Sequence, residues 1–368
     1  MAGGQVANEA QIRSIVESYK DPYLGELRAV ATIKTLSVNA TTVGATLEFG
    51  FPLRRYGQRL QAELSNVIRA QYKEITVVNF ELVWNVQPRA VQKGLQRHPA
   101  VKNVIAIGSG KGGVGKSTVT ANLALALQAE GATVGVLDAD IYGPSQTRML
   151  GMRGKPDSSD GKTFKPLRPY DMQAISIGLM VEEETPMIWR GPMVSQALQQ
   201  LMFQTQWEQL DYLLVDLPPG TGDIQLTLSQ RVPVSGAIVV TTPQDIALLD
   251  ARKAFRMFQK VEVPVLGLVE NMSTHICSRC GHAESIFGAG GAEKMAQDYG
   301  IELLGTLPLD IRIREQADSG KPTVAAEPEG NLSEIYHAIA LRAVARLSLR
   351  PKDYSGLMPK VVVQSEGK

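Results

Sequence analysis

The sequence predicts an α/β protein in which a doubly wound, mostly parallel sheet follows a small α+β module. Three observations predict this fold. A chain of 368 residues is too long for one ordinary hydrophobic core. From residue 104 onward, short apolar runs alternate with amphipathic segments, as in a parallel sheet with helices on both faces. Residues 1–88 lack this alternation, and a polar segment separates the two parts.

The small module, residues 1–88, contains both helical and strand patterns. In residues 10–21, apolar side chains recur at helical spacing, which predicts an amphipathic helix. Residues 27–51 predict two short strands on either side of an Asn-Ala-Thr-Thr turn. A second amphipathic helix is predicted at residues 59–72 and a last strand at residues 75–86.

Residues 89–103 form a predicted linker, because they are polar and punctuated by proline and glycine.

The second domain, residues 104–349, contains apolar runs that predict buried parallel strands: VIAIG, TVGVLDAD, DYLLVDLP, GAIVVTT, VLGLVE and ELLGTLP. Between them lie longer amphipathic segments such as STVTANLALALQAEG, which predict crossover helices. Residues 350–368 are predicted to be a loosely ordered tail. Ligands bind such sheets at the carboxyl ends of the strands.

A glycine-rich motif follows the first of these strands and precedes a helix: GSGKGGVGKST. It matches the P-loop pattern G-x-x-x-x-G-K-[ST], whose backbone N–H groups surround nucleotide phosphates. Lys116 is expected to neutralise the β- and γ-phosphates of ATP, and Ser117 to bind Mg²⁺. The expected nucleotide-binding residues are Gly110, Lys111, Gly112, Gly113, Val114, Gly115, Lys116, Ser117 and Thr118. A glycine-rich turn without a ligand is the alternative, and the complete motif between a strand and a helix argues against it.

Acidic residues end two other predicted strands. Asp138 and Asp140 lie in VLDADIYGPS, and Asp216 lies in LLVDLPPGTGD, followed by Gly220. Asp216 is placed to hold Mg²⁺, and Gly220 would let a loop N–H reach the γ-phosphate. Either aspartate alone could be a helix cap or a turn residue, but the neighbouring P-loop favours the nucleotide role. The second domain is therefore predicted to be a P-loop NTPase domain.

The second lysine of the loop, Lys111, resembles the signature lysine of the deviant Walker A ATPases. That class includes the partition ATPases, the septum-site ATPases and the nitrogenase iron protein. The resemblance implies that ATP is enclosed at a homodimer interface, where Lys111 reaches into the partner's site and Asp140 orients the attacking water. Lys111, Lys116 and Asp140 are then the expected catalytic residues. Asn271 resembles the adenine-contacting asparagine of this class, with a strand-terminal turn residue as the alternative.

The chain has two cysteines, Cys277 and Cys280, in one C-x-x-C pair. Zinc and iron–sulfur clusters usually take four protein ligands, so one chain provides half of a four-thiolate site. An isologous dimer would place two such pairs face to face. The alternatives are zinc held by four thiolates, a mononuclear site completed by His275 and His282, and a redox dithiol.

Six blocks in the same order resemble the Mrp (ApbC-type) iron–sulfur cluster carriers over residues 100–345: LDADIYGPS, WRGPMVSQALQQ, VDLPPGTGD, TTPQDIALLDARKA, VENMSTHICSRCGHAESIFGAGGAEKMA and IREQADSGKP. The resemblance implies a slow ATPase that holds a [4Fe–4S] cluster through Cys277 and Cys280 across a homodimer. It also implies that a cluster-assembly scaffold donates the cluster and that apo-proteins accept it. The first module, with DPYLG near its start, resembles the small domain often fused upstream in this family. Some versions of that domain carry a reactive cysteine, and this one has none.

Composition disfavours two classes of partner. The net charge is +1, which argues against a nucleic-acid or anionic-membrane partner. No apolar run is long enough to span a bilayer, and the first residues lack the pattern of a secretory signal. Closely spaced thiols suit a reducing compartment, so a cytoplasmic location is expected. Two alternatives remain: a ParA-like positioning ATPase, for which the tail offers no basic helix, and a nucleotide-dependent scaffold with structural zinc.

Overall fold

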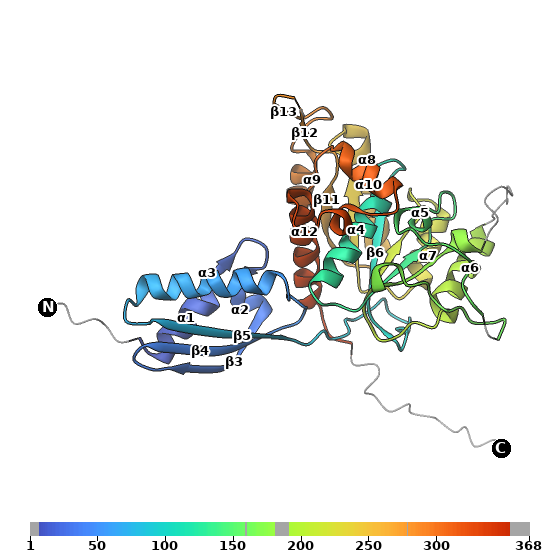
Figure 1. Ribbon diagram of the computed structural model, residues 1–368. Coiled ribbons are helices and arrows are strands. Elements are labelled where there is room, and N and C mark those ends of the chain that lie inside the picture. Colours follow the sequence, from blue (N-terminus) through green and yellow to red (C-terminus); the bar gives the residue numbers. More distant parts are fainter. Residues whose placement is uncertain (1–6, 159, 181–190, 278, 354–368) are drawn as a thin grey trace, which may run out of the picture.

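The computed structural model describes residues 7–158, 160–180, 191–277 and 279–353 (Figure 1). Most of the predicted tail, residues 354–368, therefore lies outside the described residues, as do Trp189 and Arg190 of one quoted block. Among the helices of the described ranges, none is long and apolar enough to cross a membrane.

The N-terminal module is a three-stranded sheet with its helices on one face (Figure 1). Strand β3 (Ala31–Val38) pairs antiparallel with β4 (Thr42–Phe49) across the predicted turn. Strand β5 (Val77–Trp84) pairs parallel with β4, because helix α3 (Tyr56–Gln71) crosses over between them. Helix α1 (Glu9–Ser18) precedes the sheet. Shorter elements lie between α1 and β3: β1 (Lys20–Asp21), β2 (Gly25–Glu26) and α2 (Leu27–Val30).

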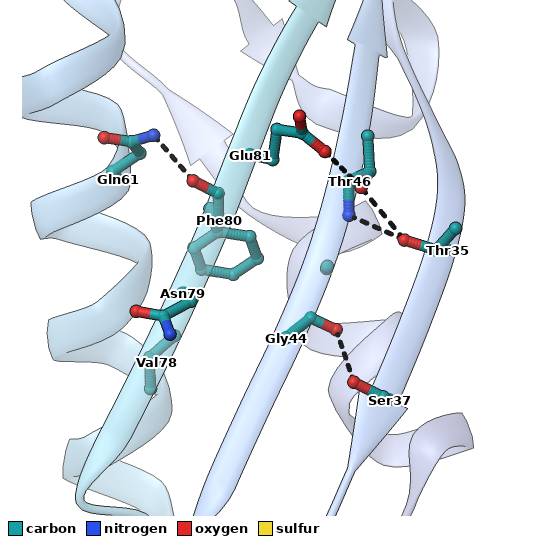
Figure 2. Close-up of a pocket in the computed structure, with 10 residues that line it drawn as sticks. Thr35, Ser37, Gly44, Thr46, Gln61, Val78, Asn79, Phe80 and Glu81 are labelled. Atoms are coloured by element: carbon teal, nitrogen blue, oxygen red, sulfur yellow. Dashed lines mark hydrogen bonds between the residues drawn. The ribbon is translucent and has the colours of Figure 1, made fainter.

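Alternation along the strands separates the two faces of this small sheet. Leu47 and Phe49 of β4 are buried against the helices, as are Leu60 and Leu64 of α3. Polar side chains occupy the other face, where Thr46 donates a hydrogen bond to Glu81 and Thr35 donates to Thr46 (Figure 2). The predicted α+β module is therefore confirmed, with one apolar and one polar face.

The second domain is built on a seven-stranded sheet in the order β14-β11-β10-β6-β9-β7-β8, in which every neighbouring pair is parallel. Its strands are β6 (Val101–Ser109), β7 (Val134–Asp138), β8 (Gln173–Ser176), β9 (Leu210–Asp216), β10 (Gly236–Thr241), β11 (Val265–Glu270) and β14 (Leu303–Thr306). The later strands lie on both sides of β6, so the strand order reverses beside it. The doubly wound parallel fold is confirmed.

Helices cover both faces of this sheet (Figure 1). They are α4 (Lys116–Ala129), α5 (Gln146–Met149), α6 (Gly191–Gln204), α7 (Asp223–Arg231), α8 (Asp245–Lys260), α9 (Gly291–Tyr299), α10 (Ile311–Asp318), α11 (Thr323–Ala326) and α12 (Asn331–Ser348), with 3₁₀ turns at Pro169–Asp171 and Ile177–Leu179. Leu123 of α4 and Val344 of α12 belong to the same buried cluster as the module's core. Phe258 of α8 and Met202 of α6 belong to a separate core on the other face.

The predicted linker is packed against the chain rather than extended through solvent. Arg89 is buried, and its guanidinium donates to the Arg350 carbonyl over 2.9 Å. Ala90 N donates to the Pro351 carbonyl over 2.9 Å. Strand β6 already begins at Val101, so the last linker residues belong to the sheet. The described start of the tail is likewise held in place by the linker.

The module is docked on the P-loop domain through the first turn of α3. Glu130, at the end of α4, accepts hydrogen bonds of 3.0 Å from both Arg55 N and Tyr56 N. The Arg55 guanidinium forms ion pairs with Glu329 (3.0 Å) and Glu334. Helix α4 therefore contacts the P-loop at one end and the module at the other.

The DPYLG segment forms a second docking contact. Its Asp21 carboxylate is buried and accepts hydrogen bonds from Tyr23 N (2.8 Å) and the Tyr56 hydroxyl (2.7 Å). These bonds orient the Tyr23 ring, which has the guanidinium of Arg342 from α12 at 5.1 Å from its centroid. The same guanidinium donates to the Pro22 carbonyl over 3.2 Å.

Candidate functional site

The P-loop connects β6 to α4 at the carboxyl edge of the sheet, beside the point where the strand order reverses. Three of its glycines are required by geometry. A Cβ on Gly110 would lie 2.1 Å from the backbone of Asp250 in α8. Gly113 (φ +79°) and Gly115 (φ +83°) adopt the left-handed conformation that other residues disfavour. The loop's backbone is therefore curled as phosphate binding requires.

Lys116 lies at the centre of a buried cluster of charges. Its Nζ is 2.6 Å from Asp216 Oδ1 and 3.3 Å from Asp140 Oδ2. The Ser117 hydroxyl lies 3.3 Å from the same Nζ. Burial lowers the pKa of Lys116, but the charges of Asp216 and Asp140 outweigh it and raise the pKa overall, so the ammonium stays protonated. The structure brings these four predicted residues together.

Asp138 organises the strand end instead of facing the P-loop lysine. Its Oδ2 accepts hydrogen bonds from the Ser176 hydroxyl (2.9 Å) and Gln146 N (3.0 Å). Burial, and then the charge of Asp216, raise its pKa to about 7. Burial also raises the pKa of Asp140, where the charge of Lys116 opposes the shift. Two carboxylates, Asp216 and Asp140, thus pair with one ammonium, with Asp138 close behind them, a charge balance suited to a site that also binds a cation.

Gln146 and Thr120 belong to the site and were missed by the sequence reasoning. The Gln146 amide donates to Asp216 Oδ2 and to the Ser117 carbonyl, both over 2.9 Å. The Thr120 hydroxyl lies 3.2 Å from Asp216 Oδ1. Both side chains are fully buried and fix the Asp216 carboxylate. Two features of the sequence could have revealed them: Gln146 directly follows DADIYGPS, and Thr120 lies one helical turn after Lys116.

Two further residues that were predicted to contact the phosphates, Lys111 and Gly220, have hydrogen-bond partners within the chain. The Lys111 ammonium lies 3.2 Å from Gln244 Oε1, just before α8. Gly220 has φ +102°, and its N–H donates to the Ser109 carbonyl over 2.9 Å. A γ-phosphate contact from Gly220 would require that bond to break. Gly112 is exposed on the loop, and Thr118 is partly exposed in the first turn of α4. The nucleotide roles of all these residues stay predictions.

Asn271 follows β11 and touches the P-loop from the side. Its Nδ2 donates to the Val114 carbonyl over 2.9 Å, and its Oδ1 accepts from Met272 N over 2.9 Å. The side chain is 7% exposed. An adenine contact by this asparagine stays a prediction.

The two cysteines lie on a hairpin formed by β12 (His275–Ile276) and β13 (Ala283–Glu284), which projects from the domain (Figure 1). Cys277 N donates to the His282 carbonyl over 2.9 Å. Cys277 is partly exposed and Cys280 is exposed. Backbone N–H groups of Arg279 and Cys280 lower the pKa of the Cys277 thiol, which favours the thiolate that binds metals.

The histidines beside the cysteines do not complete a metal site within the part of the chain that the structure describes. His275 Nδ1 lies 3.3 Å from the Leu309 carbonyl. His282 is exposed. Over residues 7–158, 160–180, 191–277 and 279–353, no group of three or more His, Cys, Asp or Glu side chains is arranged to hold a metal ion. Each described chain therefore offers two thiol ligands from this hairpin.

Large apolar side chains are exposed on segments that follow strands of the sheet. Their positions are after β7, at the start of α8 after β10, in the hairpin region after β11, and at the start of α10 after β14. They are Tyr142, Ile246, Leu249, Ile276, Ile286 and Ile311, with exposed fractions of 53% to 69%. Because the carboxyl ends of parallel strands share one edge, these side chains belong to the P-loop edge. Exposed apolar groups gathered on one edge are typical of an interaction surface.

Comparisons with known proteins agree with a P-loop NTPase domain in this chain. The profile described as ParA, NUBPL iron-transfer P-loop NTPase, matches residues 100–344. An iron-sulfur cluster carrier protein of Haemophilus influenzae is 48% identical over 342 residues, which is 92% of this chain and 91% of that protein. The iron-sulfur cluster transfer protein NUBPL of Mus musculus is 51% identical over 254 residues, or 68% of this chain and 80% of that protein. A nucleotide-binding protein from Archaeoglobus fulgidus in complex with ADP is 35% identical with a TM-score of 0.54, covering 63% of this chain and 91% of that one.

Proposed function

The chain belongs to the ParA family of NUBPL iron-transfer P-loop NTPases, as an iron–sulfur cluster carrier, and from this premise we propose an ATP-dependent mode of action. In it, a homodimer holds a [4Fe–4S] cluster as its cargo and transfers the cluster to apo-proteins. The donor is a cluster-assembly scaffold. Thiols that serve as cluster ligands suit a reducing compartment, so we place the protein in the cytoplasm.

The observation that carries the proposal is the position of the C-x-x-C hairpin. Cys277 and Cys280 are accessible, and they project from the same sheet edge that carries the P-loop. Four thiolates suit a [4Fe–4S] cluster, and two chains related by a two-fold axis supply four. The exposed apolar side chains on this edge, such as Ile246 and Ile276, would be covered in such a dimer.

The buried charge cluster supports ATP binding and slow hydrolysis. Lys116 would hold the β- and γ-phosphates, while Ser117 and Asp216 would hold Mg²⁺. Bound Mg²⁺ would withdraw charge from the phosphates. A phosphate must compete with Asp216 and Asp140 for the Lys116 ammonium, so nucleotide binding rearranges this ion-pair network. Asp140 would orient the attacking water, and Lys111 would act across the dimer interface.

Coupling between nucleotide and cluster follows from their shared edge. A nucleotide that changes the geometry at this edge changes the distance between the two cysteine pairs, and so the stability of a bridging cluster. A ligand shifts such an equilibrium only by its difference in affinity for the two states. Hydrolysis then resets the dimer for the next cluster.

Metal and sulfide analysis tests the proposal. The protein is reconstituted anaerobically, and iron, acid-labile sulfide and zinc are measured per dimer with the visible spectrum and the oligomeric state. About four irons and four sulfides per dimer are expected, lost in Cys277→Ala and Cys280→Ala. Ser273→Ala, in the same segment but without a thiol, is the matched control and should keep its cluster. Zinc without sulfide would refute the carrier function and leave a scaffold with a structural metal.

A further inference from the structure

The cysteine hairpin is attached to the sheet at two consecutive residues at the end of β11, Glu270 and Asn271. On the outgoing side, Asn271 begins the segment that leads to β12. On the returning side, Glu270 Oε2 accepts a hydrogen bond of 3.1 Å from Ala292 N, in the first turn of α9. Both ends of the hairpin region are therefore held at one point of the sheet.

That point is in direct contact with the P-loop. Asn271 donates to the Val114 carbonyl over 2.9 Å. A Cβ on Gly115 would lie 2.1 Å from Asn271 Nδ2, so the loop backbone and the asparagine are packed without a gap. Because Asn271 is almost fully buried, it has no room to move independently of the Val114–Gly115 peptide.

The segment from Asn271 to Cys277 is short and held along its length. Met272 has φ +58°, a left-handed turn that its backbone bond to Asn271 Oδ1 stabilises. Ser273 then donates to the Leu307 carbonyl from its N–H (2.9 Å) and its hydroxyl (3.0 Å). A held segment of this length transmits a displacement of Asn271 to the cysteines instead of absorbing it.

We propose that Asn271 is a positioning residue that couples nucleotide binding in the P-loop to the thiols of Cys277 and Cys280. The inference rests on the proposed function, since it takes the P-loop to bind ATP. Phosphates align the N–H groups of the loop, which turns the Val114–Gly115 peptide and the carbonyl to which Asn271 is bound. The Asn271 side chain is the contact through which one site biases the other.

Thiol alkylation tests the coupling without any cluster, because the two cysteines of the chain both lie in the hairpin. The rate of maleimide labelling of the cluster-free full chain is measured with and without saturating Mg²⁺ and a non-hydrolysable ATP analogue. Nucleotide binding is measured separately with a fluorescent nucleotide. In the wild type, the nucleotide is expected to change the labelling rate about fivefold or more.

Asn271→Asp removes the proposed contact while keeping the size of the side chain. Its carboxylate still accepts from Met272 N, but it has no donor for the Val114 carbonyl. The comparison is made at a nucleotide concentration raised until the fluorescent nucleotide shows that the variant is saturated, and the variant should then show no rate difference. Asn271→Ala, which adds no charge beside the loop, is the second variant and should behave in the same way. Ser273→Ala removes the hydroxyl bond to Leu307 but keeps the N–H bond of 2.9 Å that holds the segment, and it leaves the P-loop contact intact, so it should keep the rate difference.

The outcomes distinguish this inference from the proposed function. Retention of the full rate difference in both Asn271 variants overturns the coupling role, and so does a wild type whose labelling ignores bound nucleotide. Failure of the wild type to bind nucleotide overturns the ATP-dependent function and the coupling together. Failure to reconstitute a cluster, with the labelling pattern as expected, overturns cluster carriage and supports the coupling.

Discussion

Replacing Glu130 should loosen the docking of the N-terminal module. The first N–H groups of a helix have no partner within the helix, and the N-cap residue of α3, Arg55, makes no side-chain cap. Glu130 supplies the missing acceptor from another domain through its bonds to Arg55 N and Tyr56 N. Its other oxygen, Oε1, lies 3.7 Å from His337 Nδ1, in a position where neither atom is exposed to solvent.

The magnitude follows from these contacts. Loss of a helix cap costs about 0.5–2 kcal/mol, and the small cavity left by Glu130→Ala adds about 1 kcal/mol. Relief of a buried carboxylate offsets part of this loss, because burial raises the pKa of Glu130. A net decrease of about 2 kcal/mol in the free energy of unfolding is expected for Glu130→Ala. Glu130→Gln keeps an acceptor oxygen and should lose less than about 1 kcal/mol.

Urea unfolding measures the free energy, and limited proteolysis of residues 87–100 reports the docking. Glu329→Ala is the matched control, because Glu329 contacts the same Arg55 at 3.0 Å but its side chain is 83% exposed. An exposed ion pair contributes about 0–1 kcal/mol, so this variant should remain near the wild type. If Glu130→Ala and Glu329→Ala prove equally mild, the interdomain cap contributes nothing and the reasoning is wrong.

Three further predictions concern the P-loop domain. Gly110→Ala should destabilise the protein by more than about 2 kcal/mol in urea unfolding, since its Cβ would meet the Asp250 backbone. Gly143→Ala is the control and should be neutral, because a Cβ at Gly143 has no atom within 4 Å. Similar values for the two variants would contradict this prediction. Lys116→Ala leaves two buried carboxylates without their cation and should lower the free energy of unfolding by about 3–5 kcal/mol. Added Mg²⁺ should restore part of the lost stability in thermal unfolding. A melting temperature insensitive to the substitution would refute the prediction. Burial lowers the pKa of His337 to about 4, from an ordinary value of 6.5, so the folded state favours the neutral ring. The contribution of the neutral His337 ring to the free energy of unfolding is present above pH 6.5 and is lost as the pH falls through 4, by at most about 3 kcal/mol. The raised pKa of Glu130 acts in the opposite direction. His337→Gln should flatten this part of the curve of unfolding free energy against pH.

The strands of the large sheet were predictable because their apolar runs are long and bounded by turn residues. The runs that end in Asp138 and Asp216 are found as β7 and β9. Strand β8 (Gln173–Ser176) was missed because four residues are too few for a period to show. The hairpin strands β12 and β13 are shorter still, so the sequence revealed the cysteines but not the fold that presents them.

Side-chain partnerships across long distances in the chain could not be predicted. Glu130 caps a helix that begins 74 residues earlier in the sequence, and no local pattern marks that pairing. Gln146 joins Asp216 from a four-residue helix that carries no motif. By contrast, Lys116 and Asp216 were predicted to share a site because a P-loop and a strand end meet at one sheet edge.

During synthesis, the ribosome releases β6 long before the strands that flank it. Ile105 of β6 pairs with Leu214 of β9 and with Gly236 of β10. The strand that leads into the P-loop therefore emerges with both edges unpaired, and such edges associate readily with other nascent chains. Helix α12, which packs on α4 and β14, is made later still. A nascent chain should thus depend on chaperone protection until α12 is free to fold.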